Sequence, residues 1–344
     1  MADPRFYNRL GLLSLEEIAA LTGAAISDSG AAKQVVESVG PLNTASTGQL
    51  SYADSEKALS ALPDKDFQGV VIFTRPELGE VLTQKGAIVL SHPSPRAGFS
   101  KALASIFKIK SFDQKEAIHK GAIIPSSVII SPNVVIGEGA ELGESVTIGP
   151  GAAIGPGCKI GANSRIGAHV TLLCTEMGEN CNILSGAVIG ESGFGVAISP
   201  DGLVDVPHLG GVVLGNNVTI GANTTIDRGV FGMTRFGDDC KVDNICHIAH
   251  NVTVGNNLVM AGFSGISGST TLEDGVMFGG RVGLSDHIHI GKGATIGSNA
   301  AVMADVPAGE TYAGAPAQPI RNHMREIAEL RRLVRNKTKT KKKS

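Results

Sequence analysis

A large apolar residue returns at almost every sixth position from Ile124 to Val302, a stretch that makes up more than half of the chain. The spacing produces twenty-seven repeats, and the last twelve, from Phe236 to Val302, follow one another without a break. A period of six matches neither the 3.6 residues of a helical turn nor the alternation of a β-strand. The spacing therefore predicts a solenoid of hexapeptides, in which every sixth side chain meets the same environment.

Three hexapeptides, about eighteen residues, would complete one coil of a triangular prism. The repeats then predict about nine coils, stacked as parallel strands roughly 4.8 Å apart with the apolar side chains inside. A β-sandwich with glycine-rich turns is the alternative, and the unbroken register argues against it, while the spacing leaves the handedness open. Small residues after the apolar positions are expected to form corners with positive φ. They are Gly137, Gly143, Gly149, Gly155, Gly161, Gly167 and Asp243.

The first 115 residues lack this period and are predicted to form a separate α/β domain. Ser14-Leu-Glu-Glu17 is a capping box that starts a helix, and Gly23 is expected to end it. No Walker or dinucleotide-binding glycine motif occurs, so the usual phosphate loops are not expected. We predict strands at 34–39, 70–73 and 87–90, helices at 55–62, 76–82 and 96–107, and a linking helix or loop at 108–120. The predicted domains are 1–115, the solenoid at 116–318, and a C-terminal basic helix and tail at 319–344.

The cysteines and the start of the chain indicate the compartment. An odd number of cysteines without metal-ligand spacing or a secretion signal favours reduced thiols in the cytoplasm. No apolar run approaches the roughly eighteen residues of a membrane span, so a soluble protein without a transmembrane segment is predicted. The cysteines are Cys158, Cys174, Cys181, Cys240 and Cys246.

The C-terminal segment is basic. From Ile320 to Ser344, ten Lys or Arg residues face two Glu, a net charge of +8 in a chain whose total is −2. Apolar residues recur at helical spacing after Pro319, which predicts an amphipathic helix, and a disordered end is expected from Lys337 onward. The segment is either a solubilising end or a dock for an acidic partner. Nucleic acid is not the expected partner, because no aromatic residues interleave with the charges.

A filled solenoid offers only shallow outer faces, whereas small-molecule sites are concave. A second protomer is the simplest source of another wall. We therefore predict an oligomer, with three prisms closed around a symmetry axis and active sites between subunits.

Four of the nine histidines gather in two short segments, Asp243–Asn251 and Asp286–His289. His250 and His287 are thirty-seven residues apart, which is two coils and one position, so both are expected on one outer face about 10 Å apart. A metal site is disfavoured, because Asp243, His247 and His250 do not converge across a flat corner. Ordinary solvated histidines are one interpretation. Acid–base chemistry is the other, since the imidazole pKa of about 6.5 suits a proton acceptor near neutrality.

Four motifs carry a resemblance to a known family. They are Ile189-Gly-Glu-Ser-Gly-Phe-Gly195, Val206-Pro-His-Leu-Gly210, Ile220-Gly-Ala-Asn-Thr-Thr-Ile-Asp-Arg-Gly229 and Asp243-Asn-Ile-Cys-His-Ile-Ala-His-Asn251. The register resembles that of the left-handed parallel β-helix acyltransferases. With the motifs, and with Gly314-Ala-Pro-Ala317 after the coils, the chain resembles the UDP-3-O-(3-hydroxyacyl)glucosamine N-acyltransferases of lipid A biosynthesis.

This resemblance implies a mainly β protein, a left-handed parallel β-helix that forms a homotrimer. It implies transfer of a 3-hydroxyacyl chain from an acyl carrier protein to the 2-amino group of UDP-3-O-acylglucosamine. The donor carries its own phosphopantetheine, so no bound cofactor is expected. His250 is the implied general base, His287 lies near the substrate phosphates, and Asn251 is expected to contact substrate. Gly268, one coil after His250, is a candidate to donate its N–H to the oxyanion, and the acidic carrier protein matches the basic tail.

The family holds uracil with a stretch that reads Leu-Ser-Phe-x-x-Asn-x-x-Tyr. Here Leu50-Ser51-Tyr52 is followed by Ser55 in place of Asn and Ala58 in place of Tyr. Tyr52 and Ser55 are therefore expected to bind uridine in a weakened or redistributed site. The alternatives are an O-acyl or acetyl-CoA-dependent transferase on the same fold, and a non-catalytic paralogue with an altered nucleotide site.

Overall fold

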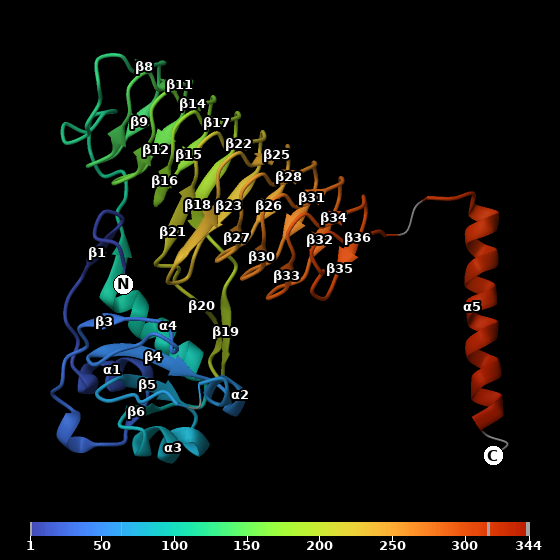
Figure 1. Cartoon of the computed structure of the whole chain (residues 1–344). Coiled ribbons are helices and arrows are strands. Elements are labelled where there is room, and N and C mark those ends of the chain that lie inside the picture. Colours follow the sequence, from blue (N-terminus) through green and yellow to red (C-terminus); the bar gives the residue numbers. More distant parts are fainter. Residues whose placement is uncertain (1, 63, 315–316, 342–344) are drawn as a thin grey trace.

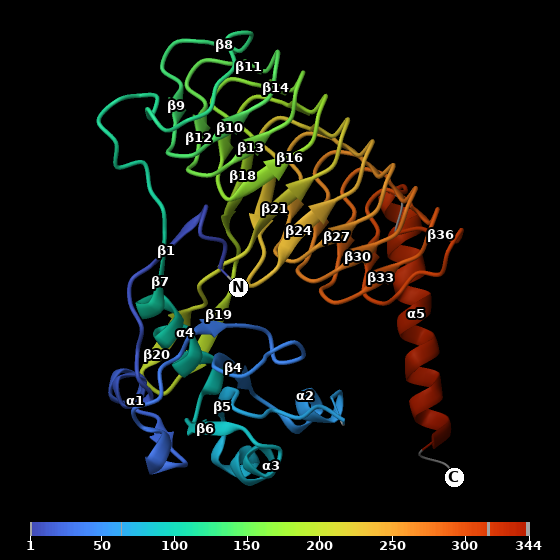
Figure 2. The same ribbon diagram turned by 60° about the vertical axis from the view of Figure 1, so that its left-hand side comes forward.

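The computed structural model describes residues 2–62, 64–314 and 317–341, which form an N-terminal α/β domain, a long β-helix and a terminal helix. The coils of the β-helix lie side by side along one axis, with the α/β domain beside the early coils (Figure 1). In the turned view of Figure 2, strands β19 and β20 reach from the coils to helix α4 of the domain. No helix in the described part of the chain is long and apolar enough to cross a membrane.

A five-stranded sheet in the order β2-β6-β5-β4-β3 forms the centre of the N-terminal domain. The first and last strands of the domain, β1 and β7, form a separate two-stranded sheet. The predicted capping box is present at Ser14, and Gly23 ends the helix with a φ of 76°. Strand β4 was not predicted, because its polar residues hide the apolar pattern. The elements are β1 (Tyr7–Arg9), α1 (Leu15–Thr22), β2 (Ala25–Ile26), η1 (Ser29–Ala31), β3 (Ser38–Val39), β4 (Gln49–Ala53), α2 (Glu56–Ser60), β5 (Val71–Thr74), η2 (Pro76–Leu78), α3 (Gly79–Gln84), β6 (Ile88–Ser91), α4 (Pro95–Ile106) and β7 (Phe107–Ile109).

Three parallel sheets of ten, nine and eight strands form the sides of the left-handed β-helix, in agreement with the predicted number of coils. The ten-stranded sheet holds β8 (Ile129–Ile130), β11 (Thr147–Ile148), β14 (Arg165–Ile166), β17 (Asn182–Ile183), β22 (Thr219–Ile220), β25 (Lys241–Val242), β28 (Val259–Met260), β31 (Met277–Phe278), β34 (Thr295–Ile296) and β36 (Thr311–Tyr312). The nine-stranded sheet holds β9 (Val135–Ile136), β12 (Ala153–Ile154), β15 (Thr171–Leu172), β18 (Val188–Ser192), β23 (Thr225–Arg228), β26 (His247–Ile248), β29 (Gly265–Ile266), β32 (Gly283–Leu284) and β35 (Ala301–Val302). The eight-stranded sheet holds β10 (Glu141–Leu142), β13 (Lys159–Ile160), β16 (Thr175–Met177), β21 (Gly211–Leu214), β24 (Met233–Phe236), β27 (Thr253–Val254), β30 (Thr271–Leu272) and β33 (His289–Ile290).

The predicted inward residues form one continuous core. Each strand pairs with its counterpart in the next coil, so that Ile248 lies opposite Ile266 and Ile266 opposite Leu284. All the predicted inward positions are buried except Ile124 and Ile130, which lie in the first coil and lack a covering neighbour on one side. The six-residue register therefore identified the core correctly.

The corner prediction was wrong in its position. Positive φ occurs three residues after the inward side chain, as at Asn133 and Asn257, and not directly after it. The glycine directly after the inward residue serves another purpose: a Cβ on Gly143 would lie 2.5 Å from the backbone nitrogen of Ala162 in the next coil. Close approach of coils, and not backbone conformation, requires glycine there.

The six-residue register also explains why four of the five cysteines are buried. Cys158, Cys181, Cys240 and Cys246 each lie two positions before an inward residue, at a repeat position whose side chains join the apolar core. All five cysteines are free and buried, and burial raises the pKa of the Cys158 thiol to about 12. These thiols are packing groups.

A β-hairpin interrupts the repeats and joins the two domains. Its strands β19 (Val196–Ser199) and β20 (Gly202–Asp205) pair antiparallel, and Ala197 and Val206 pack against Ala97 of α4. The Tyr7 hydroxyl adds a second link, at 2.7 Å from the Gly210 carbonyl oxygen. The N-terminal domain is therefore attached where the register breaks.

The terminal helix α5 (Ile320–Lys341) stands apart from the coils (Figure 1). It contradicts the expectation of disorder from Lys337 onward, because lysine is a good helix former and the helix continues to Lys341. The predicted tail residues 342–344, and Ala315 and Pro316 of the Gly-Ala-Pro-Ala motif, lie outside the described residues. Ile320, Met324 and Leu330 are exposed along the helix.

The left-handed corners can be tested at Asn257, which is exposed and has a φ of 60°. Asn257→Val should lower the free energy of unfolding by about 1–2 kcal/mol, because a β-branched residue resists positive φ. Asn257→Gly should leave stability nearly unchanged, since glycine adopts this conformation without strain. Urea denaturation measures both, and equal losses would contradict the assignment.

Candidate active site

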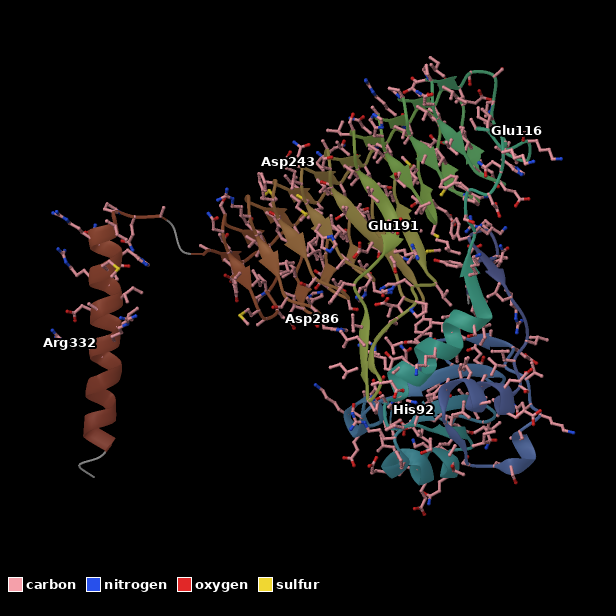
Figure 3. The ribbon with its side chains drawn as sticks, turned by 180° about the vertical axis from the view of Figure 1, so that it is seen from behind. His92, Glu116, Glu191, Asp243, Asp286 and Arg332 are labelled. Carbon is pink, nitrogen blue, oxygen red and sulfur yellow. The ribbon has the colours of Figure 1, made fainter. Side chains whose placement is uncertain are left out.

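Three stacked corners at the edge of the nine-stranded sheet form one side of a cavity of about 680 Å³. The Ser269 N–H donates to the His250 carbonyl oxygen at 3.0 Å, and the His287 N–H donates to that of Gly268 at 3.1 Å. His250, Gly268 and His287 all line the cavity, so the structure brings together the three residues that counting placed on one face. Figure 3 shows the neighbouring Asp286 at the edge of the coils near the N-terminal domain.

The hydrogen bonds of Asn251 set the tautomer of His250. The Asn251 side-chain oxygen accepts from the Val230 N–H at 2.9 Å and lies 3.2 Å from His250 Nδ1. Because this oxygen acts as an acceptor, Nδ1 carries the ring proton and Nε2 keeps its lone pair. Asn251, expected to contact substrate, thus orients the candidate base and is not among the residues lining the cavity.

Gly268 leaves space beside that lone pair. A Cβ at this position would lie 2.7 Å from His250 Cε1 and 3.0 Å from Nε2, so any side chain would displace the imidazole. Within the described residues, the Gly268 N–H has no hydrogen-bond partner. The position therefore combines an open space with a free backbone donor, as an oxyanion site requires.

His208 lies behind His250 and was missed as a site residue, although its motif was noted. The two rings meet edge to face, with centroids 5.1 Å apart. His208 is 1% exposed; its Nδ1 lies 2.9 Å from the Val206 carbonyl oxygen, and its Nε2 has no partner among described residues. Burial, reinforced by the charge of His250, lowers the pKa of His208 to about 4, so it is neutral near pH 7. The only sequence signal was its place in an interruption of the register.

A buried carboxylate also borders the cavity. Asp227, at the end of β23, lies 3.6 Å from His247 Nε2, and His247 Nδ1 lies 2.8 Å from the Thr225 hydroxyl. Burial raises the pKa of Asp227, against the opposing effect of His247. The loop before β19 covers the other side of the cavity. Gly193 in this loop lies against the rings of His208 and His250, and the exposed Phe194 lines the cavity.

The predicted uridine residues lie elsewhere. Tyr52, in β4, packs against Phe99 with ring centroids 5.2 Å apart, and burial raises the pKa of its hydroxyl. Ser55 caps α2, and its hydroxyl accepts from the Ala58 N–H at 3.3 Å. Neither lines the cavity, so their role in binding uridine stays a prediction.

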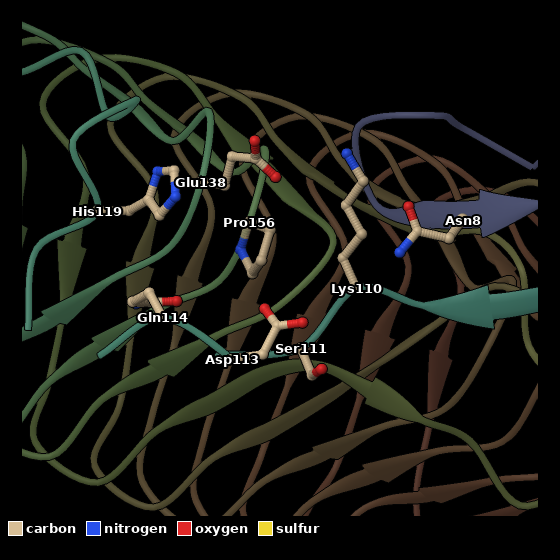
Figure 4. A pocket seen from close by; sticks show the side chains of 8 residues that line it. All are labelled: Asn8, Lys110, Ser111, Asp113, Gln114, His119, Glu138 and Pro156. Atoms are coloured by element: carbon tan, nitrogen blue, oxygen red, sulfur yellow. The ribbon is translucent and has the colours of Figure 1, made fainter. Parts of the chain in front are cut away.

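A second cavity, of about 220 Å³, opens near the first coil and the β1–β7 pair (Figure 4). Lys110, Asp113, His119 and Glu138 line it with mixed charge, and it shares no residue with the His250 cavity. Among the described residues, no three His, Cys, Asp or Glu side chains are grouped as metal ligands.

Comparison with known protein families agrees with the hexapeptide repeat. The bacterial transferase hexapeptide model (six repeats) matches residues 139–174, and the hexapeptide repeat of succinyl-transferase matches 206–230 and 269–304. The coils and these matches define a hexapeptide-repeat protein of the transferase class.

The relatives identify the family. The chain is 54% identical over 343 residues, the full length of both, to the UDP-3-O-acylglucosamine N-acyltransferase of Maricaulis maris (strain MCS10). It is 48% identical to that of Caulobacter sp. (strain K31), over 96% of this chain and 97% of the relative. For Methylobacterium nodulans the identity is 43%, over 97% of both chains. The chain belongs to the UDP-3-O-acylglucosamine N-acyltransferase family.

Titration of His208 gives a testable pH dependence. Its pKa is about 4 in the folded chain against an ordinary 6.5, so between these values the unfolded chain binds more protons. Protonation of His208 in the unfolded chain should therefore lower the free energy of unfolding as the pH falls below about 6.5, by at most about 1.4 kcal/mol per pH unit. Urea denaturation at pH about 7 and about 5 should show that the free energy of unfolding decreases less on acidification for His208→Gln than for wild type. Equal losses would contradict a buried neutral His208.

Proposed function

We propose that the His250 cavity is where the N-acyl transfer of this family takes place. The substrates are UDP-3-O-acylglucosamine and a 3-hydroxyacyl chain on the phosphopantetheine of an acyl carrier protein. The observation that carries the proposal is the His250 imidazole, whose Nδ1 is held by Asn251 and whose Nε2 is beside the space left by Gly268.

The reaction follows from these groups. The 2-amino nitrogen attacks the thioester carbon, a C–N bond forms, and the carbonyl electron pair moves to oxygen while His250 Nε2 takes the amine proton. The Gly268 N–H donates to the oxyanion. When the intermediate collapses, the C–S bond breaks and the imidazolium returns the proton to the leaving thiolate. Asn251 stabilises the imidazolium through Nδ1, and neutral His208 adds no charge beside it.

We assign the remaining substrate contacts by their position. His287 lies two coils from His250 on the same cavity and is suited to the sugar-phosphate side. Tyr52 offers an aromatic face and Ser55 a hydroxyl, both in the N-terminal domain, for uridine. With Ala58 in place of the family's tyrosine, uracil is held by one aromatic residue, and the phosphates contribute more to affinity.

An exposed apolar patch supports a homotrimer. Ile245 and Phe263 are 50% and 62% exposed at left-handed corners, next to exposed Val259 and Met277 on the ten-stranded sheet. Such a patch on a monomer marks an interaction surface, and this corner is at the other edge of the nine-stranded sheet from His250. A neighbouring protomer that packs its patch against this sheet would close the open cavity.

The basic helix α5 is the proposed dock for the carrier protein. Arg321, Arg325 and Arg331 project from a helix that stands clear of the coils, and complementary charge would steer an acidic carrier to it. The free buried cysteines suit a reducing cytoplasm, where we place the enzyme.

His250→Ala should lower kcat for amide formation by about 10²–10⁴, since the transition state loses its proton acceptor. His169→Ala is the control, because His169 likewise lies in a turn between two strands of the coils but is outside the cavity. The assay supplies UDP-3-O-acylglucosamine with a 3-hydroxyacyl-carrier protein or the same chain on coenzyme A. Unchanged turnover by folded His250→Ala would refute the role, and equal use of both donors would refute the carrier dock.

Phe263→Asp should convert the trimer to monomers, because it places a charge in the apolar patch. Activity should fall with the loss of the second cavity wall. Light scattering after gel filtration measures the mass, and Leu12→Asp, at an exposed apolar residue of the N-terminal domain, is the control. An active Phe263→Asp monomer would show that the cavity is complete within one chain.

A further inference from the structure

Arg96 is a cation without a partner at the edge of the His250 cavity. It is half-buried, near the start of α4, and among the described residues its guanidinium makes no hydrogen bond or ion pair. Its Nε is buried and lacks an acceptor. Arginine donors removed from water are normally paired, so an unpaired one beside a cavity indicates an absent anionic group.

The surroundings of Arg96 favour a ligand over a missing internal contact. Its backbone N–H donates to Asp54 Oδ1 at 3.3 Å, which fixes the main chain while the guanidinium stays free. Of the described residues that line the cavity, Arg96 alone is Lys or Arg. The nearby carboxylate Asp227 is already next to His247. The guanidinium is therefore available to an acceptor from outside the chain.

Arg96 lies between the two parts of the proposed site, because Phe99, about one helical turn further along α4, packs on Tyr52, and Arg96 itself lines the cavity of His250. Burial raises the pKa of the Tyr52 hydroxyl, and the positive charge of Arg96 opposes that rise. The same charge helps to lower the pKa of His208, which packs on His250. The order Tyr52, Arg96, His250 matches the order uridine, diphosphate, glucosamine in the acceptor substrate.

We propose that the Arg96 guanidinium binds the diphosphate of the sugar nucleotide and so compensates for the altered uridine site. The amino group and the phosphate oxygen are on adjacent sugar carbons, so a phosphate must lie close to the group that reacts at His250. The phosphate of the carrier's phosphopantetheine is separated from its thioester by a long arm and does not reach this cavity. The assignment rests on the proposed function, because it uses His250 as the reacting centre.

Arg96→Met should raise the KM for UDP-3-O-acylglucosamine about tenfold to a hundredfold, as expected for loss of a charge-assisted hydrogen bond, and leave the KM for the acyl-carrier protein unchanged. The KM of Arg96→Lys for UDP-3-O-acylglucosamine should lie between those of wild type and Arg96→Met, because lysine keeps the positive charge but lacks the planar set of donors of the guanidinium. Lys101→Met is the matched control: it removes one positive charge from the same helix, where Lys101 faces Asp201 at 3.7 Å.

Two further measurements separate binding from folding and from turnover. Thermal melting without substrate should show Arg96→Met at least as stable as wild type, because the guanidinium has no internal partner to lose. Calorimetry with UDP alone should show weaker binding to Arg96→Met than to wild type, and this result does not depend on turnover. An unchanged KM for the sugar nucleotide, a raised KM for the carrier, a lower melting temperature or unchanged UDP affinity would overturn the assignment. An inactive wild type that still binds UDP through Arg96 would instead refute the proposed function alone.

Discussion

The apolar contact between successive coils is the interaction on which the rest of the molecule depends. Most strands here contain two residues, which cannot hold together alone, so each coil is stable only because its neighbours cover its aliphatic interior. Coil spacing is uniform because the backbones approach closely, as at Gly143 against Ala162. The position two residues before each inward side chain adds a second apolar layer to the core, in which cysteine, alanine and valine are frequent.

This stacking also builds the candidate active site. One coil places Gly268 directly beside the His250 ring, and the next brings Asp286 and His287 to the same cavity. No loop needs to fold over a long distance to bring these groups together, since the register itself aligns them. A rigid ladder of hydrogen bonds therefore holds the proposed base and oxyanion donor in fixed relation.

The interruptions supply what a regular prism lacks. The hairpin after β18 brings His208 behind His250 and gives α4 a surface to pack on. Through that contact the N-terminal domain contributes Arg96 to a cavity otherwise made from the coils and from Phe194 in the loop before the hairpin. A regular face is shallow, so chemistry concentrates where the repeat is broken and where, as we propose, a second protomer adds a wall.

The sequence by itself determined the core, the number of coils and the common face of His250, Gly268 and His287, because a repeated local environment leaves a periodic record. It misplaced the left-handed corners, since small residues serve both close approach and positive φ, and composition does not separate the two. Only the tertiary structure decided that Asn251 faces the ring of His250, that buried His208 lies behind it, and that Arg96 is unpaired. The contacts of His208 and Arg96 join segments far apart in the chain, and the Asn251 side chain is held by Val230, in the break of the register between Ile226 and Phe236. A periodic signal holds no information about contacts made where the period stops.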